Sequence, residues 1–463
     1  MDTPNVVIML MDNLGYGDLG CYGSTVHRTP HVDRLAQEGL RLTDFYSTSG
    51  VCTPSRASLM TGCYPRRVGL HCSGLGPSVL MPMDPKGLHP DEITMAHLLR
   101  QAGCATACIG KWHLGDQPPF LPTRHGFDEY LGVPYSEDMV RSDSHPDWPP
   151  LPLMRNEEVI EAPVDRDDLT RRYTEEAIRF IRENRDRPFF LYIPHAMPGS
   201  CEEPFATPEF RGRSGNGIYG DAVEELDWSA GRIMRTLGEL GLDDRTLVIW
   251  TSDNGAVEHH PRQGSNAPLR GWGYDTSEGA QRVPCIARWP GRIPAGQVSD
   301  EIVTMMDFLP TLACLAGTEA PTDRIIDGQD LRPLLLGNSE FTSLYDEAGF
   351  FYYHMAQLQA VRAGRWKLYL PLENKKTNLS GDYSEGESAE PELYDVRNDP
   401  GEAREVSAER PEVVEHLSGL AENARQDLGD WDRKGTNQRP PGRVENPTPR
   451  VLQQRGHSTA PPG

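Results

Sequence analysis

The sequence predicts an α/β protein: a large, mainly parallel sheet sandwiched by helices, followed by a smaller α+β C-terminal domain. The sheet is indicated by three apolar runs, Asn5–Met11, Pro188–Ile193 and Thr246–Thr251, which are rich in β-branched or aromatic residues. Such runs are typical of strands buried on both faces. Polar loops and amphipathic helices alternate with them, which is the order that a parallel sheet requires.

The helices are predicted from apolar residues at helical spacing. One is expected over Thr29–Leu42, with Pro30 near its start. Others are expected over 96–102, 171–184 and 222–240, and a further strand over 105–110. In such a sheet, ligand sites lie beyond the carboxyl ends of the strands, where His, Asp and Asn residues follow the apolar runs in this sequence.

After residue 340 the pattern changes to short strands, expected over 350–353, 359–363, 366–369 and 392–395, and one helix near 411–427. We therefore predict a catalytic domain over 1–340 and a small domain over 341–434. The polar segment 375–390 is expected to be a surface loop. Residues 435–463 are rich in Pro, Arg, Gln and Gly, which is typical of an extended arm or a disordered tail.

Composition excludes several classes of function. The net charge of −22 argues against a general nucleic-acid or membrane-surface binder, and no apolar run is long enough to span a bilayer. The first ten residues lack the basic region and cleavage site of a signal peptide. We expect a periplasmic or secreted protein with its signal removed, with a cytoplasmic location as the alternative. Apart from Cys52, eight of the nine cysteines remain, an even number compatible with disulfides.

The most specific stretch begins at Cys52 and reads CTPSRASLMTG. It resembles the signature of the type I (formylglycine-dependent) sulfatases, an arylsulfatase and N-acetylgalactosamine-6-sulfatase-like family of the alkaline phosphatase superfamily. The resemblance implies that Cys52 is oxidised to formylglycine by a formylglycine-generating enzyme. One hydroxyl of the aldehyde hydrate attacks sulfur and gives a covalent sulfoenzyme intermediate, and the other then expels sulfate. Arg56 would orient the hydrate, and the helix starting near Pro54 would direct amide N–H groups at the anion.

Two turns at strand ends resemble the metal-binding turns of that family. Asp12 and Asn13 follow the first apolar run, and Asp253 and Asn254 follow the third. With residue 52, these oxygen ligands suit a hard divalent cation, Ca²⁺ before Mg²⁺. The family usually has a second Asp where this chain has Asn13, so the site loses one negative charge.

Further site residues follow from the same resemblance. In the GKWHLG turn, Lys111 would bind the sulfate, and His113 would take a proton from the spare hydroxyl to release sulfate. His195 matches a second histidine that contacts sulfate and can protonate the leaving alcohol. Ser136 matches a serine that forms a hydrogen bond near the sulfate.

The segment from Pro268 to Pro284 resembles the family's RGGKGTTYEGGxRVP segment, but Gly273 stands where a substrate-binding lysine is expected. Either His195 alone serves as the general acid, or another residue replaces the lysine. The sequence offers Arg270, His259 and His260 for that role. Trp272 and Tyr274 are candidates for a sugar subsite, and His354 is a candidate substrate contact.

The sequence therefore predicts a sulfatase that hydrolyses a sulfate monoester, most plausibly on a carbohydrate. Two alternatives stay open: a phosphonate monoester or phosphodiester hydrolase of the same superfamily, and a sulfated-glycan-binding protein with impaired catalysis. The second alternative is motivated by Asn13 and Gly273, whereas the intact set of matched residues argues against it: Cys52, Arg56, Lys111, His113 and His195. Neither the glycan nor the position of its sulfate follows from the sequence.

Overall fold

The computed structural model describes residues 3–452 except 261, 339, 378 and 380–386. Within these residues the largest feature is a ten-stranded sheet in the order β12-β2-β11-β10-β1-β9-β5-β6-β7-β8. Its strands, in that order, are Gln297–Ser299, Leu40–Leu42, Cys285–Arg288, Thr246–Ser252, Asn5–Asp12, Phe189–Pro198, Ala105–Ile109, Glu129–Gly132, Leu153–Arg155 and Glu158–Glu161.

The centre of this sheet is parallel and its outer pairings are mostly antiparallel. Strands β10, β1, β9, β5 and β6 pair in parallel, whereas β11, β7 and β8 join antiparallel. The three apolar runs of the sequence are the adjacent strands β1, β9 and β10. Their carboxyl ends therefore meet at one edge, as the doubly covered parallel sheet requires.

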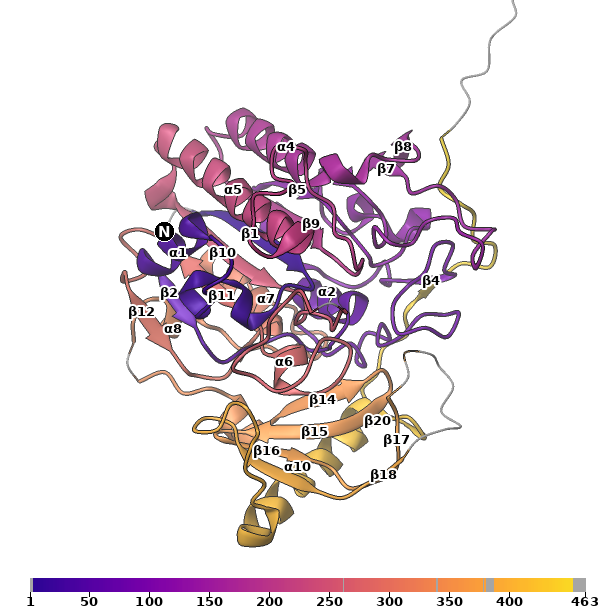
Figure 1. Ribbon diagram of the computed structural model, residues 1–463, viewed down its shortest axis with the longest axis vertical. Coiled ribbons are helices and arrows are strands. Elements are labelled where there is room, and N and C mark those ends of the chain that lie inside the picture. Colours follow the sequence, from indigo (N-terminus) through magenta and orange to yellow (C-terminus); the bar gives the residue numbers. More distant parts are fainter. Residues whose placement is uncertain (1–2, 261, 339, 378, 380–386, 453–463) are drawn as a thin grey trace, which may run out of the picture.

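Helices cover both faces of the large sheet (Figure 1). Helices α1 (Pro30–Gln37), α4 (Leu169–Glu183) and α5 (Gly217–Glu239) share one apolar core with alternate strand residues. The helices α2 (Cys52–Thr61), α3 (Met95–Gln101) and α7 (Phe308–Leu315) share a second core with the other strand residues. Among the described helices, none is long and apolar enough to cross a bilayer.

A smaller antiparallel sheet lies below the large one in Figure 1 and is covered by helix α10 (Pro411–Leu428). Its order is β14-β15-β16-β19, with bounds Phe350–His354, Gln357–Ala363, Trp366–Tyr369 and Glu392–Asp395. These elements agree with the expected α+β region, although the domain limits at 340 and 434 stay a prediction.

The remaining short elements are β3 (Phe45–Tyr46), β4 (Lys86–Gly87), β13 (Val303–Thr304), β17 (Leu372–Lys375), β18 (Glu387–Ala389), β20 (Gly429–Asp430), β21 (Arg433–Lys434), β22 (Gly442–Arg443), α6 (Glu278–Gln281), α8 (Arg332–Leu335) and α9 (Tyr345–Ala348).

Two predicted segments differ in the structure. The helix expected over 29–42 ends at Gln37, and Leu40–Leu42 forms strand β2 instead. Gly39 separates the two because its Cα lies against strand β11: a Cβ there would come 2.3 Å from the Ala287 carbonyl oxygen. The expected loop 375–390 includes strand β18, which pairs with β17, while 378 and 380–386 lie outside the described residues.

The C-terminal segment 435–452 is an extended arm that contacts the large part of the molecule. Arg439 pairs with Glu92, and β22 pairs with β4. Of the two alternatives predicted for this segment, the arm is therefore correct up to residue 452, and 453–463 lie outside the described residues. The nine cysteines, all within the described chain, carry free thiols, so the suggested disulfides are not formed.

Candidate active site

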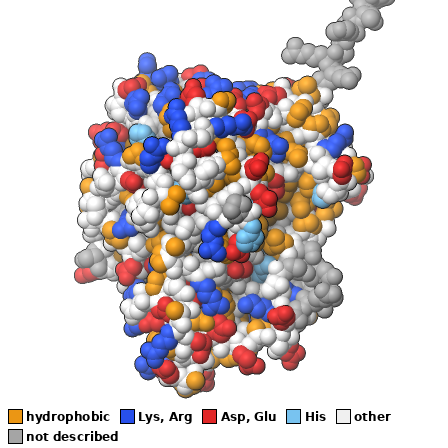
Figure 2. Space-filling view, in the orientation of Figure 1, with side chains coloured by type: hydrophobic (Ala, Val, Ile, Leu, Met, Phe, Trp, Pro, Cys, Tyr) orange, Lys and Arg blue, Asp and Glu red, His pale blue; other side chains and the backbone are white. Residues whose placement is uncertain are grey.

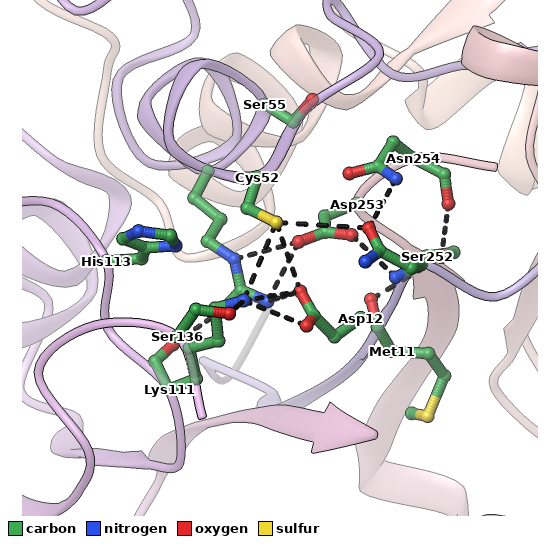
Figure 3. A network of polar contacts seen from close by, with 12 residues as sticks. Met11, Asp12, Cys52, Ser55, Lys111, His113, Ser136, Ser252, Asp253 and Asn254 are labelled. Atoms are coloured by element: carbon green, nitrogen blue, oxygen red, sulfur yellow. Dashed lines mark hydrogen bonds and ion pairs between the residues drawn. The ribbon is translucent and has the colours of Figure 1, made fainter. Parts of the chain in front are cut away.

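The ends of β1 and β10 bring four predicted metal ligands together (Figure 3). Asp12 is the last residue of β1, and Asp253 follows β10 with its amide donating to the Met11 carbonyl (3.0 Å). The Asn13 amide donates to Asp253 Oδ1 (3.1 Å), and Asn254 Nδ2 lies 2.5 Å from Asn13 Oδ1. Asn13 has a φ of 57°, a left-handed conformation that non-glycine residues rarely adopt.

Cys52 is the first residue of helix α2, so its side chain lies at the positive end of the helix dipole. Pro54 fits in this first turn because a backbone N–H there has no partner within the helix. The Cys52 Sγ lies 3.4 Å from Asp12 Oδ1 and 3.5 Å from Lys111 Nζ. Burial, and then Asp12, raises the pKa of the Cys52 thiol well above its ordinary value, so the unmodified thiol is a poor nucleophile at neutral pH.

Arg56 and Lys111 provide the positive charge of the site, and both side chains are fully buried. Arg56 lies one turn after Cys52 and bridges the two strand ends, with N–O distances of 2.9 Å to Asp12 and 2.8 Å to Asp253. Lys111 Nζ donates to both Asp12 oxygens (2.9 and 2.8 Å) and to Ser136 Oγ (2.8 Å). Lys111 thus contacts the Cys52 side chain, and Arg56 pairs with Asp12, which also contacts it.

His113 lies beside the same cluster and has one nitrogen available. Its Nε2 is 2.9 Å from the Leu80 carbonyl oxygen, which can only accept, so Nε2 carries the proton. Its Nδ1 is buried without a hydrogen-bond partner among the described residues. Burial, together with Lys111 and Arg56, holds the His113 pKa well below its ordinary value, so the ring is neutral and Nδ1 can accept a proton. Its φ of 63° is a second left-handed conformation at this site.

The residues present fit a hard metal ion. One ligand atom each from Asp12, Cys52 and Asp253 lie within 4.8 Å of one another. Asn254 Oδ1 is buried without a hydrogen-bond partner, which is the environment that a coordinated oxygen requires. Burial, and then the charge of Asp12, raises the Asp253 pKa to about 7, and a divalent cation between these carboxylates would hold both ionised.

His195 does not lie with these residues. Along β9, Tyr192 packs into the core on the α2 side of the sheet, whereas Ile193 packs into the core of α4 and α5. His195 shares the face of Ile193: its ring centroid is 6.2 Å from that of Tyr173, and its Nε2 is 3.3 Å from Ser229 Oγ. Burial lowers the His195 pKa to about 3. The structure therefore does not bring His195 together with Cys52 and Lys111, because strand alternation directs its side chain to the opposite face, and its contact with sulfate stays a prediction.

The side chains of the loop 270–274 contact different parts of the molecule. Arg270 is turned toward the small sheet, with its guanidinium over the rings of Tyr369 and Tyr394 and a 3.6 Å ion pair to Glu392. Trp272 is half-buried, and the guanidinium of Arg262 lies over its ring, 5.0 Å from the centroid. Substrate contacts by Arg270 and Trp272 therefore stay predictions.

Tyr274, by contrast, reaches the Cys52 site. Its hydroxyl lies 2.9 Å from Ser200 Oγ and 3.5 Å from Asn13 Nδ2, and its φ of 81° is left-handed. At Gly273 a Cβ would come 2.7 Å from the Gly255 carbonyl oxygen, so the expected lysine cannot be added here without a backbone shift.

The other candidate histidines lie in two places. His354 is buried at the end of β14, opposite Gln357 in the small sheet. His259 is buried and His260 exposed in the loop after β10, and burial lowers the His259 pKa although Glu202 opposes this effect. Their proposed roles stay predictions.

Two residues that the sequence did not single out border the site: Glu137 and Ser200. Glu137 Oε2 lies 3.0 Å from Ser136 Oγ and 3.9 Å from Lys111 Nζ. Ser200 Oγ accepts a hydrogen bond from Asn13 Nδ2 (2.9 Å). The position of Glu137 directly after Ser136 was the signal that could have identified it, whereas Ser200 lies in a loop without a motif.

A buried cysteine at a helix N-terminus, close to two cations and a set of oxygen ligands, fits a site that binds a tetrahedral oxyanion beside a hard metal ion. Comparison with known families agrees. Residues 4–318 match the family model Sulfatase, and 272–426 match the model N-sulphoglucosamine sulphohydrolase, C-terminal. The chain therefore belongs to the sulfatase family, and it is a sulfuric-ester hydrolase.

Similar proteins include several characterised sulfatases. The chain is 38% identical to arylsulfatase A of Homo sapiens (90% of this chain, 87% of the relative) and 40% identical to N-acetylgalactosamine-6-sulfatase of Canis lupus familiaris (79% and 71%). Among solved structures, a sulfatase from Pseudoalteromonas sp. matches with a TM-score of 0.77 and 28% identity, covering 91% of each chain. A structure described under glycosaminoglycan metabolism by Bacteroides thetaiotaomicron matches with a TM-score of 0.76 and 28% identity, covering 92% of this chain and 100% of the other.

Proposed function

We propose that this sulfatase acts on sulfate monoesters of carbohydrates and that it requires formylglycine at position 52. The observation that carries the mechanism is the position of Cys52 at the start of α2, in contact with both Asp12 and Lys111. A carbohydrate substrate is supported by the names of the glycan-related relatives and neighbours. Other relatives, such as the steryl-sulfatase of Mus musculus, are named for a non-carbohydrate ester, so sugar sulfates must be compared with a steroid sulfate as substrates.

Conversion of Cys52 explains why a buried thiol with a raised pKa lies at the centre of the site. As the hydrate of an aldehyde, formylglycine supplies two hydroxyls on one carbon, one for attack and one for release of sulfate. Because Cys52 is buried after folding, a formylglycine-generating enzyme must act on the chain before it folds. That enzyme is the partner we expect during maturation.

The chain's own residues bind the sulfate and move protons. Lys111 contacts residue 52 and, with Arg56 beside it, would hold sulfate oxygens, whereas Ser136 accepts from Lys111 and donates its proton to Glu137. A fixed, water-excluded set of donors of this kind stabilises charge that develops during the reaction. His113 Nδ1, neutral and without a partner, is the atom that would accept a proton from the oxygen at residue 52 when sulfate is released.

Asp12, Asn13, Asp253 and Asn254 would hold one Ca²⁺ ion, with Mg²⁺ as the alternative. The donor set is oxygen throughout, which suits Ca²⁺, and the unpaired Asn254 Oδ1 supports it. When bound, the ion would polarise sulfate oxygens and increase the acidity of a hydroxyl at residue 52. Asn13 in place of a carboxylate predicts weaker affinity than a site with a third charge.

We expect a periplasmic or secreted location, with a cytoplasmic location as the alternative. The nine cysteines carry free thiols, which gives no support to a periplasmic or secreted location, because disulfides are typical of oxidising compartments. Fractionation of the native host with an antibody against the chain separates the two locations.

The function is tested with enzyme made together with a formylglycine-generating enzyme. Defined sulfated mono- and oligosaccharides, a steroid sulfate, 4-nitrophenyl sulfate and a phenyl phosphonate ester are compared under one condition. We expect measurable release of sulfate from one or more sugars, with kcat/KM above that for the steroid. A preference for the phosphonate ester would support the alternative hydrolase class. Tight sugar binding without turnover by fully converted enzyme would support the impaired binding protein.

A further inference from the structure

Glu137 is a buried carboxyl group at the site whose role the sulfatase mechanism above does not include. Its side chain is fully buried. Oε1 accepts a hydrogen bond from the Ser200 amide (3.0 Å), and Oε2 accepts one from Ser136 Oγ (3.0 Å). Ser136 in turn accepts from Lys111, beside which it lies in Figure 3. Glu137 therefore contacts the anion-binding residues directly and has a fixed position.

Its carboxyl lies where β9 leaves the sheet. A Cβ at Gly199, the residue directly after β9, would come 2.2 Å from Glu137 Oε1. The Gly199 amide donates to the Asp12 carbonyl (3.0 Å), so this position is beside the end of β1. The absence of a side chain at 199 thus leaves room for Glu137 at the carboxyl edge of the central strands, where ligands bind in such sheets.

Lys111 lies close to both Glu137 and the residue that attacks the sulfur. Lys111 Nζ lies 3.5 Å from Cys52 Sγ and 3.9 Å from Glu137 Oε2, so the ammonium group contacts both sides. In a displacement at sulfur, the forming and breaking bonds are in line. When the attacking oxygen is at residue 52, the leaving oxygen is on the side of the sulfur away from residue 52, and a general acid must be within hydrogen-bond reach of that side.

Glu137 carries a proton at neutral pH. Burial raises its pKa to about 8; Lys111 opposes this effect and Asp12 adds to it. A general acid is most effective when its pKa is near the working pH. The titratable or charged groups around it are Lys111, Asp12, Asp138, Arg166, Tyr173 and Cys201.

Three of the positions considered for the leaving-group proton give Glu137 no competitor in this structure, whereas the roles of Arg270, His259 and His260 stay predictions. His195 lies on the opposite face of the sheet, and position 273 is a glycine. The only proton of His113 is on Nε2 and is donated to Leu80. Among the described groups at the site, Glu137 combines a proton, burial and contact with the sulfate-binding residues.

We propose that Glu137 is the general acid that protonates the leaving oxygen of the sulfate ester. An oxygen at residue 52, entering as its oxyanion, forms a bond to sulfur, and the ester S–O bond breaks with its electron pair going to the leaving oxygen. Glu137 transfers its carboxyl proton to that oxygen, so an alcohol departs and Glu137 becomes a carboxylate, which solvent later reprotonates. The proposal rests on the sulfatase mechanism above.

The test compares Glu137→Gln with wild type on esters whose leaving groups need different amounts of protonation. These are 4-nitrophenyl sulfate, phenyl sulfate and a sugar sulfate that the wild type hydrolyses. Glu225→Gln is the matched control, because Glu225 is also buried, has a pKa raised to about 7 by burial, and accepts two hydrogen bonds from Thr207 outside the site.

We expect Glu137→Gln to reduce kcat about 100-fold on the sugar sulfate and only a few-fold on 4-nitrophenyl sulfate. The wild-type rate on the sugar ester should fall above about pH 8, and this fall should be absent for 4-nitrophenyl sulfate. Glu137→Asp should restore part of the sugar-sulfate rate. Equal losses on all esters, or one pH profile for both, would overturn the proposal while leaving the sulfatase function intact. Failure of converted wild type to hydrolyse any sulfate would instead contradict the proposed function.

Discussion

Two clusters of buried charge lie in this molecule, and they are built differently. The first, which we call the site cluster, surrounds Cys52. The second, the bridging cluster, joins α6 and the loop after β2 to the small sheet. The site cluster consists of Asp12, Glu137, Asp253, Arg56 and Lys111. The bridging cluster consists of Asp44, Glu278, Glu402, Arg282, Arg362 and Lys367.

The bridging cluster is balanced, with three carboxylates and three cations. Glu278 at its centre accepts from the hydroxyls of Tyr46 (2.6 Å) and Tyr352 (2.8 Å) and from Lys367 (3.0 Å). Although burial would raise the pKa of Glu278, Lys367 and Arg362 lower it to about 2. A buried ionised carboxyl is tolerated here because opposite charges and hydrogen bonds surround it.

The site cluster has three carboxyl groups and two cations. Burial raises the pKa of Asp253 to about 7 and that of Glu137 to about 8, and in both cases the charge of Asp12 adds to the effect. The difference in charge balance agrees with the two proposals made above, a bound cation in the site cluster and a protonated Glu137. On the face shown in Figure 2, acidic and basic side chains are interspersed, so the overall charge of −22 does not identify the site.

The largest effect is expected at the nucleophile. Cys52→Ala should reduce turnover on the order of 10⁴-fold or more, because nothing else supplies the attacking oxygen. Turnover of 4-nitrophenyl sulfate measures this, and thermal unfolding should show a fold close to that of wild type. In active wild type, mass spectrometry of the tryptic peptide should show oxygen in place of the Cys52 sulfur and two fewer hydrogens. Undiminished activity of the variant would exclude the mechanism.

Removal of the metal should reduce turnover about 10²- to 10³-fold, since a bound ion stabilises the transition state by several kcal/mol. Ca²⁺ should restore activity and raise the melting temperature in proportion to its occupancy. Asn13→Asp adds the charge that the site lacks and should tighten Ca²⁺ binding, as titration calorimetry can measure. Unchanged affinity in that variant would show that charge does not limit binding.

Breaking the bridging cluster should affect stability and leave chemistry intact. Lys367→Met removes the ion pair of Glu402 and one of the three ion pairs of Glu278, and we expect a loss of about 3–5 kcal/mol in the free energy of unfolding. Urea denaturation measures the loss, and Lys434→Met, at an exposed position, is the control. The kcat of the folded variant should stay near that of wild type. A large fall in kcat would mean that the two clusters are coupled.

The pH dependence of stability should reflect the imbalance of the site cluster. Because folding raises the Glu137 pKa from 4.5 to about 8, folding takes up protons between these values. The contribution of Glu137 to stability is therefore present below about pH 4.5 and is lost as pH rises through 8. Denaturation of the metal-free protein at pH 5 and 8.5 should show a smaller difference for Glu137→Gln than for wild type. Equal differences would contradict the raised pKa.

The smallest effect on kinetics is expected for His195→Ala. His195 lies among residues of α4 and α5, so the variant should change kcat by less than about threefold on either aryl or sugar sulfates. Its cost should instead be about 1–3 kcal/mol of stability from the cavity and the lost hydrogen bond. A fall in kcat on the sugar ester alone would indicate that His195 protonates the leaving group, and it would weaken the case for Glu137.

Much of the architecture could be predicted from local sequence. The apolar runs that became β1, β9 and β10 are long and flanked by polar loops, so their burial and parallel order follow from composition and spacing. The motif around Cys52 and the two strand-end turns predicted which residues would meet. Segment ends were less predictable: Leu40–Leu42 has helical spacing, but Gly39 and the pairing with β11 make it a strand.

The sequence by itself determined the class of fold, the nucleophile position and the oxygen-rich turns, because each depends on a contiguous motif. Only the tertiary structure decided which face of β9 carries His195 and what fills the space beside Gly199. Those outcomes depend on strand alternation counted from the sheet pairing and on a glutamate more than sixty residues earlier in the chain. Proton transfer depends on distances of a few ångströms between such separate segments, and local patterns do not encode those distances.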